Sequence, residues 1–82
     1  MQWKDKDNFL EKNFSFDTFV QAMIFVNRIA DIAEQLNHHP EISIHDYNQV
    51  RIQTTTHSEG KITQKDYDLA ERVDSVFFEI TK

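Results

Sequence analysis

The spacing of apolar side chains changes at about residue 17, and this change predicts two elements, a strand followed by a helix. Residues 9–16 alternate between apolar and polar, as in a short strand with Leu10 and Phe14 on one side. Lys12 interrupts that side. Over residues 17–37 the spacing becomes helical, and apolar residues recur at three- and four-residue steps: Phe19, Met23, Val26, Ala30, Ala33 and Leu36.

Both ends of this predicted helix carry sequence signals. Ser15 and Asp17 are each suitable N-caps, because their side chains can accept hydrogen bonds from the first free N–H groups. Pro40 predicts the end, because proline disfavours helical geometry in the residue before it. Further apolar residues widen the stripe, so we expect this helix to contact both a sheet and a second subunit: Ile24, Phe25, Ile29 and Ile32.

Alternation returns over residues 42–56 and predicts one long strand or a hairpin. One parity carries the residues suited to a core face: Val50, Ile52, Thr54 and Thr56. The other parity is polar and continues to His57, which is followed by a loop around the single glycine, Gly60. Trp3 could begin an earlier strand, although residues 4–8 are polar.

A second helix is predicted over residues 63–80. Its apolar stripe is regular: Leu69, Ala70, Val73, Val76, Phe77 and Ile80. Thr63 and Asp66 have the spacing of a capping box at its start. The order of elements favours a small two-layer α+β domain, an antiparallel sheet with two main helices packed on one face. No stretch resembles a linker, so residues 1–82 are interpreted as a single domain.

Composition narrows the classes of function. The chain has 82 residues, of which 39% are hydrophobic, enough for one small core. It has no Cys, which excludes disulfides, thiolate metal ligands and cysteine nucleophiles. The net charge of −5, without a basic run, disfavours nucleic acid and anionic membranes as partners. No apolar stretch has the ~20 residues of a membrane span, and we expect a cytoplasmic protein.

Three of the four histidines follow the ends of predicted elements, which makes them candidates for chemistry. His38 and His39 follow the first helix, and His57 ends the strand region. If that strand returns beside the helix end, all three line one cleft. Histidines have an ordinary pKa of ~6.5, which suits general acid–base work near neutrality.

Each candidate also has a simpler structural interpretation. His38 and His39 could complement the helix dipole as a polar terminus. Asp66 could serve only in the capping box. Glu34 lies four residues before His38, a spacing that places both on one helix face as a surface pair. His45, beside Asp46, fits a solvated turn.

A metal site is a competing use of three histidines, since three can hold zinc with an open position. However, His38 and His39 are adjacent and project in different directions, and the nearby carboxylates lack a familiar ligand spacing. We therefore expect no metal.

The arrangement of these residues resembles the signature of the pterin-4a-carbinolamine dehydratase family. The signature consists of Glu34-x-x-x-His38-His39-Pro40, then Tyr47, His57 and Asp66, within the segments AEQLNHHPE, YNQVRIQTTTH and ITQKDYDLA. The resemblance extends over most of the chain, from about residue 10 to residue 76. The combination is more specific than an isolated His-His-Pro.

This resemblance implies an enzyme that dehydrates 4a-hydroxytetrahydropterin to quinonoid dihydropterin and so recycles the pterin of aromatic amino-acid hydroxylases. By matching positions, His38, His39 and His57 are the expected catalytic histidines. Asp66, Glu34 and Pro40 are the expected supporting or substrate-binding residues. The family further implies a homodimer or homotetramer, a small pterin as the substrate, and no cofactor.

The chain departs from the family pattern near the predicted hairpin. The spacing from Pro40 to Tyr47 is one residue longer than usual, which predicts a β-bulge near His45 and Asp46. Ile42 stands where many members have Trp.

Two other classes of function stay open at this point. Some members of the family are dimerisation partners of a transcription regulator, so the chain could be a protein-interaction module. It could also be a homologue that binds pterin, or a molybdopterin-related compound, without turning it over.

Overall fold

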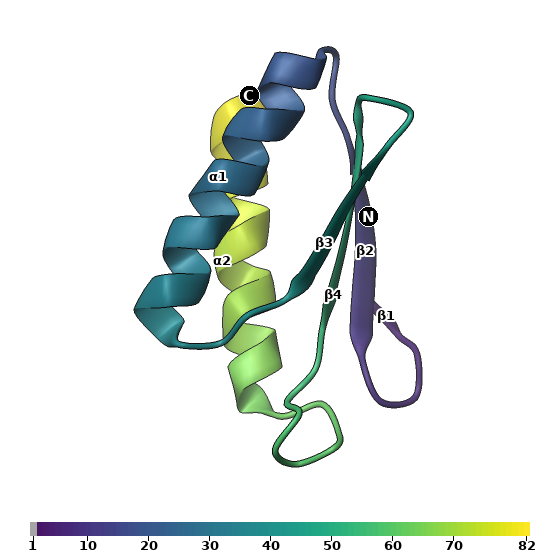
Figure 1. Cartoon of the computed structure of the whole chain (residues 1–82), viewed down its shortest axis with the longest axis vertical. Coiled ribbons are helices and arrows are strands. Elements are labelled where there is room, and N and C mark those ends of the chain that lie inside the picture. Colours follow the sequence, from purple (N-terminus) through teal and green to yellow (C-terminus); the bar gives the residue numbers. More distant parts are fainter. Residues whose placement is uncertain (1) are drawn as a thin grey trace.

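The computed structural model describes residues 2–82 and shows two layers, a sheet and a pair of helices (Figure 1). The antiparallel sheet has the strand order β1-β2-β4-β3, and both helices lie on one of its faces. The elements in chain order are β1 (Lys4–Asp5), β2 (Leu10–Ser15), α1 (Phe19–Leu36), β3 (Glu41–His45), β4 (Gln49–Thr54) and α2 (Gln64–Thr81). The predicted α+β class is confirmed.

The strand region after the first helix is a hairpin of β3 and β4. Its register is unbroken from the Glu41–Gln53 pair to the His45–Gln49 pair. The predicted bulge is therefore wrong. The chain turns instead through a loop in which Asp46 and Tyr47 both have positive φ, 52° and 54°. The sheet is therefore regular up to this loop.

The core lies between the inner face of the sheet and the two helices. Four aromatic rings form its centre, with centroids 4.9–6.0 Å apart in the contacting pairs: Phe14, Phe16, Phe25 and Phe77. Tilted and edge-on rings at this separation add favourable contacts to the burial of their surface. The regular stripe of α2 is buried as predicted at Leu69, Ala70, Val73 and Val76.

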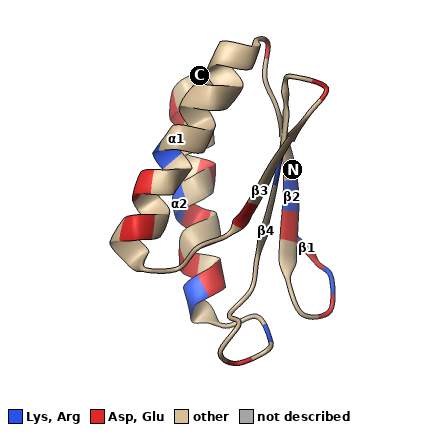
Figure 2. Cartoon of the chain, viewed as in Figure 1, with Lys and Arg blue, Asp and Glu red and all other residues tan. Residues whose placement is uncertain are grey.

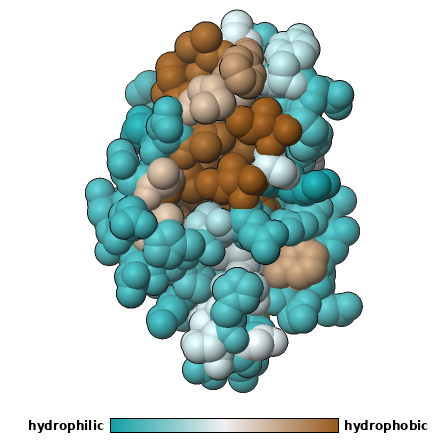
Figure 3. Space-filling view, in the orientation of Figure 1, coloured by the Kyte–Doolittle hydropathy of each residue, from teal (hydrophilic) through white to brown (hydrophobic). Residues whose placement is uncertain are grey.

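The buried face of α1 differs from the predicted stripe. Its buried residues are Ala22, Phe25, Ile29, Ile32 and Ala33, whereas Phe19 is 51% exposed. Apolar residues cover so wide an arc of this helix that their spacing alone does not select the inward side. Val20 and Ile24 stay exposed as well, and Figure 3 shows apolar surface gathered over the α1 side of the molecule.

Helix α1 begins at a different cap from the two that were predicted. Ser15 is still in β2, where it pairs with Gln49, and the cap is Thr18. The Oγ1 of Thr18 accepts a hydrogen bond from the N–H of Gln21 at 3.0 Å. The helix therefore starts later than its first suitable polar residue, because the sheet holds that residue extended.

The same helix ends before Pro40, through a left-handed residue. Asn37 has φ 51° and ψ 44°. The N–H of Asn37 donates to the carbonyl of Glu34 (3.3 Å), and the N–H of His38 donates to the carbonyl of Ala33 (3.1 Å). This is the Schellman pattern, which satisfies the last free carbonyls of a helix.

The polar segment near the N-terminus forms β1 and is fixed to the helix layer. The Trp3 Nε1–H donates to Asp74 Oδ2 (3.0 Å), and the Lys12 ammonium donates to Asp74 Oδ1 (2.8 Å). This ion pair explains how Lys12 occupies the core-facing side of β2. Within residues 2–82, neither helix combines the length and the apolar character that a membrane span needs.

Substitutions at Asn37 test the helix end. Asn37→Ala should lower the free energy of unfolding by about 1 kcal/mol, because a Cβ without a polar group disfavours left-handed geometry. Asn37→Gly should be at least as stable as the parent, because glycine adopts positive φ freely. Urea denaturation of both variants measures this. Equal destabilisation by Ala and Gly would contradict the assigned cause.

Candidate active site

The three candidate histidines lie around one hollow of about 250 Å³. His38 and His39 come from the segment after α1, and His57 comes from the segment after β4. The hollow is lined by these three residues together with Asn37, Thr55, Thr56, Ser58 and Lys65. The shared cleft expected from the sequence is thus present.

The sheet register explains why residues so far apart in sequence meet. Because β3 and β4 are antiparallel and Glu41 pairs with Gln53, the residues before Glu41 run beside those that follow Gln53. The left-handed turn at Asn37 sends the chain from the helix end into this position. The end of α1 and the end of β4 therefore meet at one edge of the two layers.

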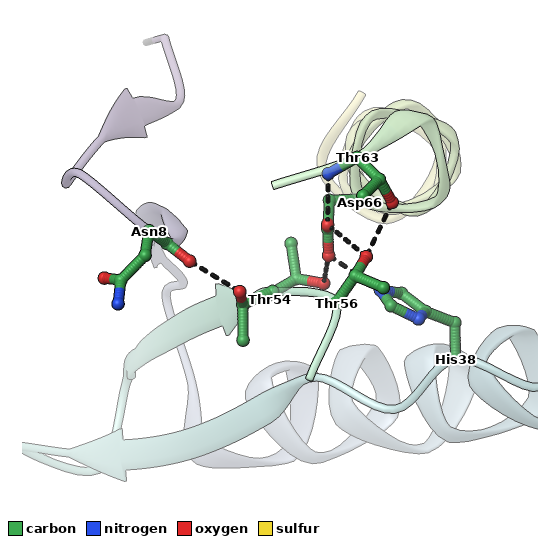
Figure 4. A network of polar contacts seen from close by, with 7 residues as sticks. Asn8, His38, Thr54, Thr56, Thr63 and Asp66 are labelled. Atoms are coloured by element: carbon green, nitrogen blue, oxygen red, sulfur yellow. Dashed lines mark hydrogen bonds and ion pairs between the residues drawn. The ribbon is translucent and has the colours of Figure 1, made fainter. Parts of the chain in front are cut away.

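A fully buried carboxylate, Asp66, contacts two residues that line this hollow, His38 and Thr56 (Figure 4). Its Oδ1 accepts from Thr54 Oγ1 (2.6 Å) and lies 2.6 Å from His38 Nε2. Its Oδ2 accepts from Thr56 Oγ1 (2.7 Å) and from the backbone N–H of Thr63 (2.9 Å). Four donors thus surround one carboxylate, which joins α2, β4 and the segment after α1.

The geometry of this network determines which atoms are the hydrogen-bond donors. An ionised carboxylate only accepts, so the Nε2 of His38 must carry the proton that it shares with Asp66. This leaves Nδ1 as the nitrogen of His38 that can exchange a proton. Thr56 donates its single hydroxyl proton to Asp66, so Thr63 Oγ1 is the donor in its 2.6 Å contact with Thr56 Oγ1.

The same hydrogen bonds set the charge of Asp66. Burial by itself raises the pKa of a carboxyl group, because it removes water from the charged form. Here the four hydrogen bonds together outweigh burial and hold the pKa of Asp66 below its ordinary value. Asp66 is therefore an anion that fixes the orientation of the His38 ring.

Glu34 contacts a different histidine from the one that its spacing suggested. Its Oε2 lies 2.6 Å from Nε2 of His39, and both side chains are exposed. The expected Glu34–His38 pair on one helix face is wrong. Because the helix ends at Leu36, His38 no longer follows the helical spacing and reaches the buried Asp66 instead.

A second hollow, of about 240 Å³, adjoins the first and shares His39, Thr55 and His57 with it. We call the first the histidine hollow and the second the outer hollow. The outer hollow is also lined by Phe9, Glu41, Gln53 and Thr54. Pro40 lines neither hollow, and a role for it stays a prediction.

The fourth histidine, His45, lines neither hollow. The Nε2 of His45 lies 3.1 Å from Asn13 Oδ1, at the hairpin end of the sheet. Within residues 2–82 no group of three or more His, Asp or Glu side chains is arranged to hold a metal ion.

Several site residues were not identified from the sequence. Thr54 and Thr56 hold the Asp66 carboxylate, although the alternation marked them only as core-facing. A hydroxyl residue on the buried parity of a strand needs a partner, and this requirement is the signal that could have linked them to Asp66. Phe9 and Glu41 had no such signal. They line the outer hollow because the pairing of β2 and β3 with β4 brings them beside residues 53–55.

Comparison with known proteins places these features in a family. The family model described as "Pterin 4 alpha carbinolamine dehydratase" matches residues 1–76. A protein of Picosynechococcus named "Putative pterin-4-alpha-carbinolamine dehydratase" is 43% identical over 75 residues, which cover 92% of this chain and 80% of that protein. A protein of the same name from Herpetosiphon aurantiacus is 47% identical over 75 residues, covering 92% and 77%.

Solved structures show the same architecture. The crystal structure of a transcriptional coactivator/pterin dehydratase from Brucella melitensis matches with a TM-score of 0.81 and 33% identity, over 92% of this chain and 79% of that chain. A pterin dehydratase-like protein identified as a RuBisCO assembly factor in the alpha-carboxysome matches with a TM-score of 0.80 over 94% and 90%. At 22% identity, the second match is a likeness of fold alone. The resemblance noted from the sequence is confirmed.

Removing the charge of Asp66 should destabilise the fold. Asp66→Asn places an N–H₂ group among four donors and should cost about 3 kcal/mol or more of unfolding free energy. Asp68→Asn is the matched control, because Asp68 lies on the same helix and contacts only the exposed Gln64 side chain. Urea denaturation of both variants measures the difference. Equal effects of the two substitutions would contradict the network.

The lowered pKa of Asp66 also predicts how stability depends on pH. The charge of Asp66 stabilises the fold at pH values above the unfolded pKa of ~3.9. That contribution declines as the pH falls through the lower folded pKa. The Asp66→Asn variant should therefore lose less stability on acidification than the parent does. Urea denaturation from about pH 7 down to about pH 2 tests this, and parallel curves for the two proteins would refute it.

Proposed function

The chain belongs to the pterin 4 alpha carbinolamine dehydratase family, and from this premise we propose that it removes water from 4a-hydroxytetrahydropterin to give quinonoid dihydropterin. The observation that carries the proposal is the gathering of His38, His39 and His57 around one hollow, with His38 held by a buried anion. Recycling of the pterin of aromatic amino-acid hydroxylases is the corresponding role.

The reaction needs one proton donor and one proton acceptor. The bond between carbon 4a and its hydroxyl oxygen breaks, and a proton delivered to that oxygen lets it leave as water. The adjacent ring nitrogen loses its own proton, and its electron pair forms the new carbon–nitrogen double bond. No oxidant is consumed. Imidazole groups can serve in both roles near neutral pH.

His38 is the proposed base. Its Nε2–H is donated to Asp66, and its Nδ1 is thereby left as the acceptor in the neutral ring. A carboxylate that fixes the tautomer and orientation of a base, and stabilises the imidazolium that forms, has the role of the third member of a catalytic triad. Asp66 is thus a positioning residue, since it is fully buried and four protein donors occupy its two oxygens.

His39 and His57 are the candidates for the acid. Both line the histidine hollow and the outer hollow. The Oε2 of Glu34 lies 2.6 Å from Nε2 of His39 and can hold the orientation of that ring. His57 is exposed at the end of the strand region, where a ligand can reach its ring. Single substitutions of His39 and His57 distinguish the two assignments.

The exposed apolar residues of α1 support self-association. Phe19, Val20 and Ile24 are 51%, 65% and 46% exposed and lie on one helix. Such a patch is typical of an interface between proteins. We propose that it is covered in the expected homodimer or homotetramer, and the same surface would serve a module that binds another protein. The cytoplasmic location stays a prediction.

A dehydration assay tests the proposed activity. Chemically generated 4a-hydroxytetrahydropterin should give the quinonoid absorbance faster with the protein than in buffer alone. Binding of the pterin without acceleration would refute the dehydratase proposal and favour the non-catalytic homologue. Neither binding nor acceleration would favour the protein-interaction module.

Histidine variants test the assigned roles. His57→Ala should lower kcat by about 10²- to 10⁴-fold, the usual contribution of one acid–base group, and leave stability unchanged because the side chain is exposed. His38→Ala should lower kcat similarly and also reduce stability, since Asp66 loses a donor. His45→Ala, at the hairpin end, is the control and should retain activity. Full activity of His57→Ala with impaired His39→Ala would assign the acid to His39.

A further inference from the structure

Strand β3 lies at a free edge of the sheet, and its sequence is complementary to a second copy of itself. We propose that two copies of the chain pair through β3 in an antiparallel register centred on Ser43. In this contact Glu41 of each copy forms an ion pair with His45 of the other, so the pairing strengthens when His45 is protonated. The contact goes beyond the proposed function, because it involves neither the dehydration nor the exposed residues of α1.

The backbone hydrogen bonds of the sheet determine which groups β3 leaves free. The N–H of Phe16 donates to the carbonyl of Asn48 (2.9 Å) and continues the register of β2 with β4. The backbone groups of even-numbered residues in β4 therefore point toward β2, and those of odd-numbered residues point toward β3. In β3 the N–H and C=O groups of Ile42 and Ile44 consequently point to the outside. The described residues place no further strand beside them.

The five residues of β3, Glu-Ile-Ser-Ile-His, fit this geometry in one register. When two copies are centred on Ser43, Ile42 of one lies opposite Ile44 of the other. Each of these isoleucines then both donates and accepts a backbone hydrogen bond. At both ends of the pair, Glu41 lies opposite His45 on the outer face of the sheet. A shift by two residues would pair only three residues of each strand and would separate Glu41 from His45.

The inner side of β3 also has apolar surface that the helices do not cover. Ile42 and Ile44 are half-buried, whereas their register partners Ile52 and Val50 are fully buried. Figure 3 shows apolar surface that reaches from α1 toward β3. Pairing of two free edges brings the isoleucines of both copies together and continues this surface from one copy to the other. Such pairing is also a common way to protect an exposed edge strand.

The hydrogen bonds of His45 leave one ring nitrogen available for the second copy. Asn13 Nδ2 donates to Gln49 Oε1 (2.8 Å), so Asn13 Oδ1 is the acceptor in its 3.1 Å contact with His45 Nε2. Nε2 therefore carries the proton of the neutral ring, and Nδ1 gains a proton when the ring becomes charged. The side chain of His45 is 41% exposed, which leaves the ring accessible to a carboxylate at the free edge.

The acidic groups around His45 make the contact sensitive to pH. Figure 2 shows acidic positions at the start of β3 and in the turn that follows it. The second is Asp46, whose Oδ2 lies 3.9 Å from Nδ1 of His45. In the paired copies Glu41 approaches the same ring, so two carboxylates meet there. A neutral His45 leaves their repulsion unbalanced, whereas a protonated His45 attracts both.

The other charged or titratable groups near the two residues lie on the outer face of the sheet, in the turn or in the outer hollow: Arg51, Glu11, Tyr47, His39 and His57. Both helices pack on the opposite face of the sheet (Figure 1). All of these groups are retained when His45 is replaced by glutamine. A pH dependence that disappears in that variant therefore belongs to His45.

The pH dependence of self-association tests the ion pair. Histidine has an ordinary pKa of ~6.5, so the pair is present at about pH 5.5 and lost at about pH 8. The dissociation constant of the paired copies, measured by sedimentation equilibrium, should be roughly 3- to 20-fold higher at the higher pH, as expected for two exposed ion pairs. His45→Gln and Glu41→Gln should each remove this dependence.

Glu71→Gln is the matched control, because it removes the same charge from an exposed position of α2. It should keep the pH dependence of the parent protein. Unchanged pH dependence in His45→Gln, or equal effects of Glu41→Gln and Glu71→Gln, would overturn the proposal. So would a chain that stays monomeric at both pH values.

A cysteine at Ser43 tests the register directly, because the chain has no cysteine of its own. In the proposed register the two residues at this position form a pair without backbone hydrogen bonds, with Cα atoms ~4.5 Å apart. This separation suits a disulfide. Ser43→Cys should therefore form a covalent dimer on mild oxidation, seen by non-reducing electrophoresis. Ser75→Cys, exposed on α2, is the control and should form far less at the same pH.

Equal cross-linking of the two cysteine variants would refute the register. Cross-linking through position 43 in a protein that does not accelerate dehydration would refute the proposed activity and leave this inference standing. Dehydration by a protein without that cross-link would have the opposite meaning.

Discussion

A negative charge without contact to water must be surrounded by donors, and Asp66 imposes this requirement on the whole domain. Its donors come from β4, from the first turn of α2 and from the segment after α1. An unmatched charge in this position would cost several kcal/mol, so the three segments are held at fixed distances from one another. Two of the groups that contact Asp66 at this junction, His38 and Thr56, also line the histidine hollow. The positions of these lining residues therefore follow from the hydrogen bonds that the buried Asp66 carboxylate requires.

The junction also shows how a helix end can serve two purposes. The left-handed Asn37 satisfies the free carbonyls of α1 and turns His38 away from the helical path. Without that turn, His38 would follow the face of Glu34 and stay in solvent. The surface pair formed instead, between Glu34 and His39, is exposed at both side chains and so contributes little to stability. The two neighbouring histidines thus differ in surroundings by far more than their adjacency suggests.

The spacing of apolar residues was sufficient to predict the α+β architecture and the buried face of α2, because the polar and apolar faces of that helix separate sharply. It was insufficient for α1, because apolar residues cover most of its circumference and only packing against Phe14 and Phe16 decides which side turns inward. The cap at Thr18 could not be chosen from sequence, since β2 keeps Ser15 in the sheet. The family signature located the candidate histidines and Asp66, but it did not indicate which histidine contacts Asp66 and which contacts Glu34. Which carboxylate meets which imidazole depends on where the helix stops, and backbone dihedral angles determine that.

The docking of Trp3 has a practical consequence. It is the only tryptophan of the chain, its ring meets Phe14 edge-on at 5.9 Å, and its indole N–H is held by Asp74. Its emission spectrum is consequently an internal optical reporter for separation of the sheet from α2. Unfolding, or detachment of Trp3 and β1 from α2, can be followed by tryptophan fluorescence in unlabelled protein, at concentrations far below those needed for magnetic resonance.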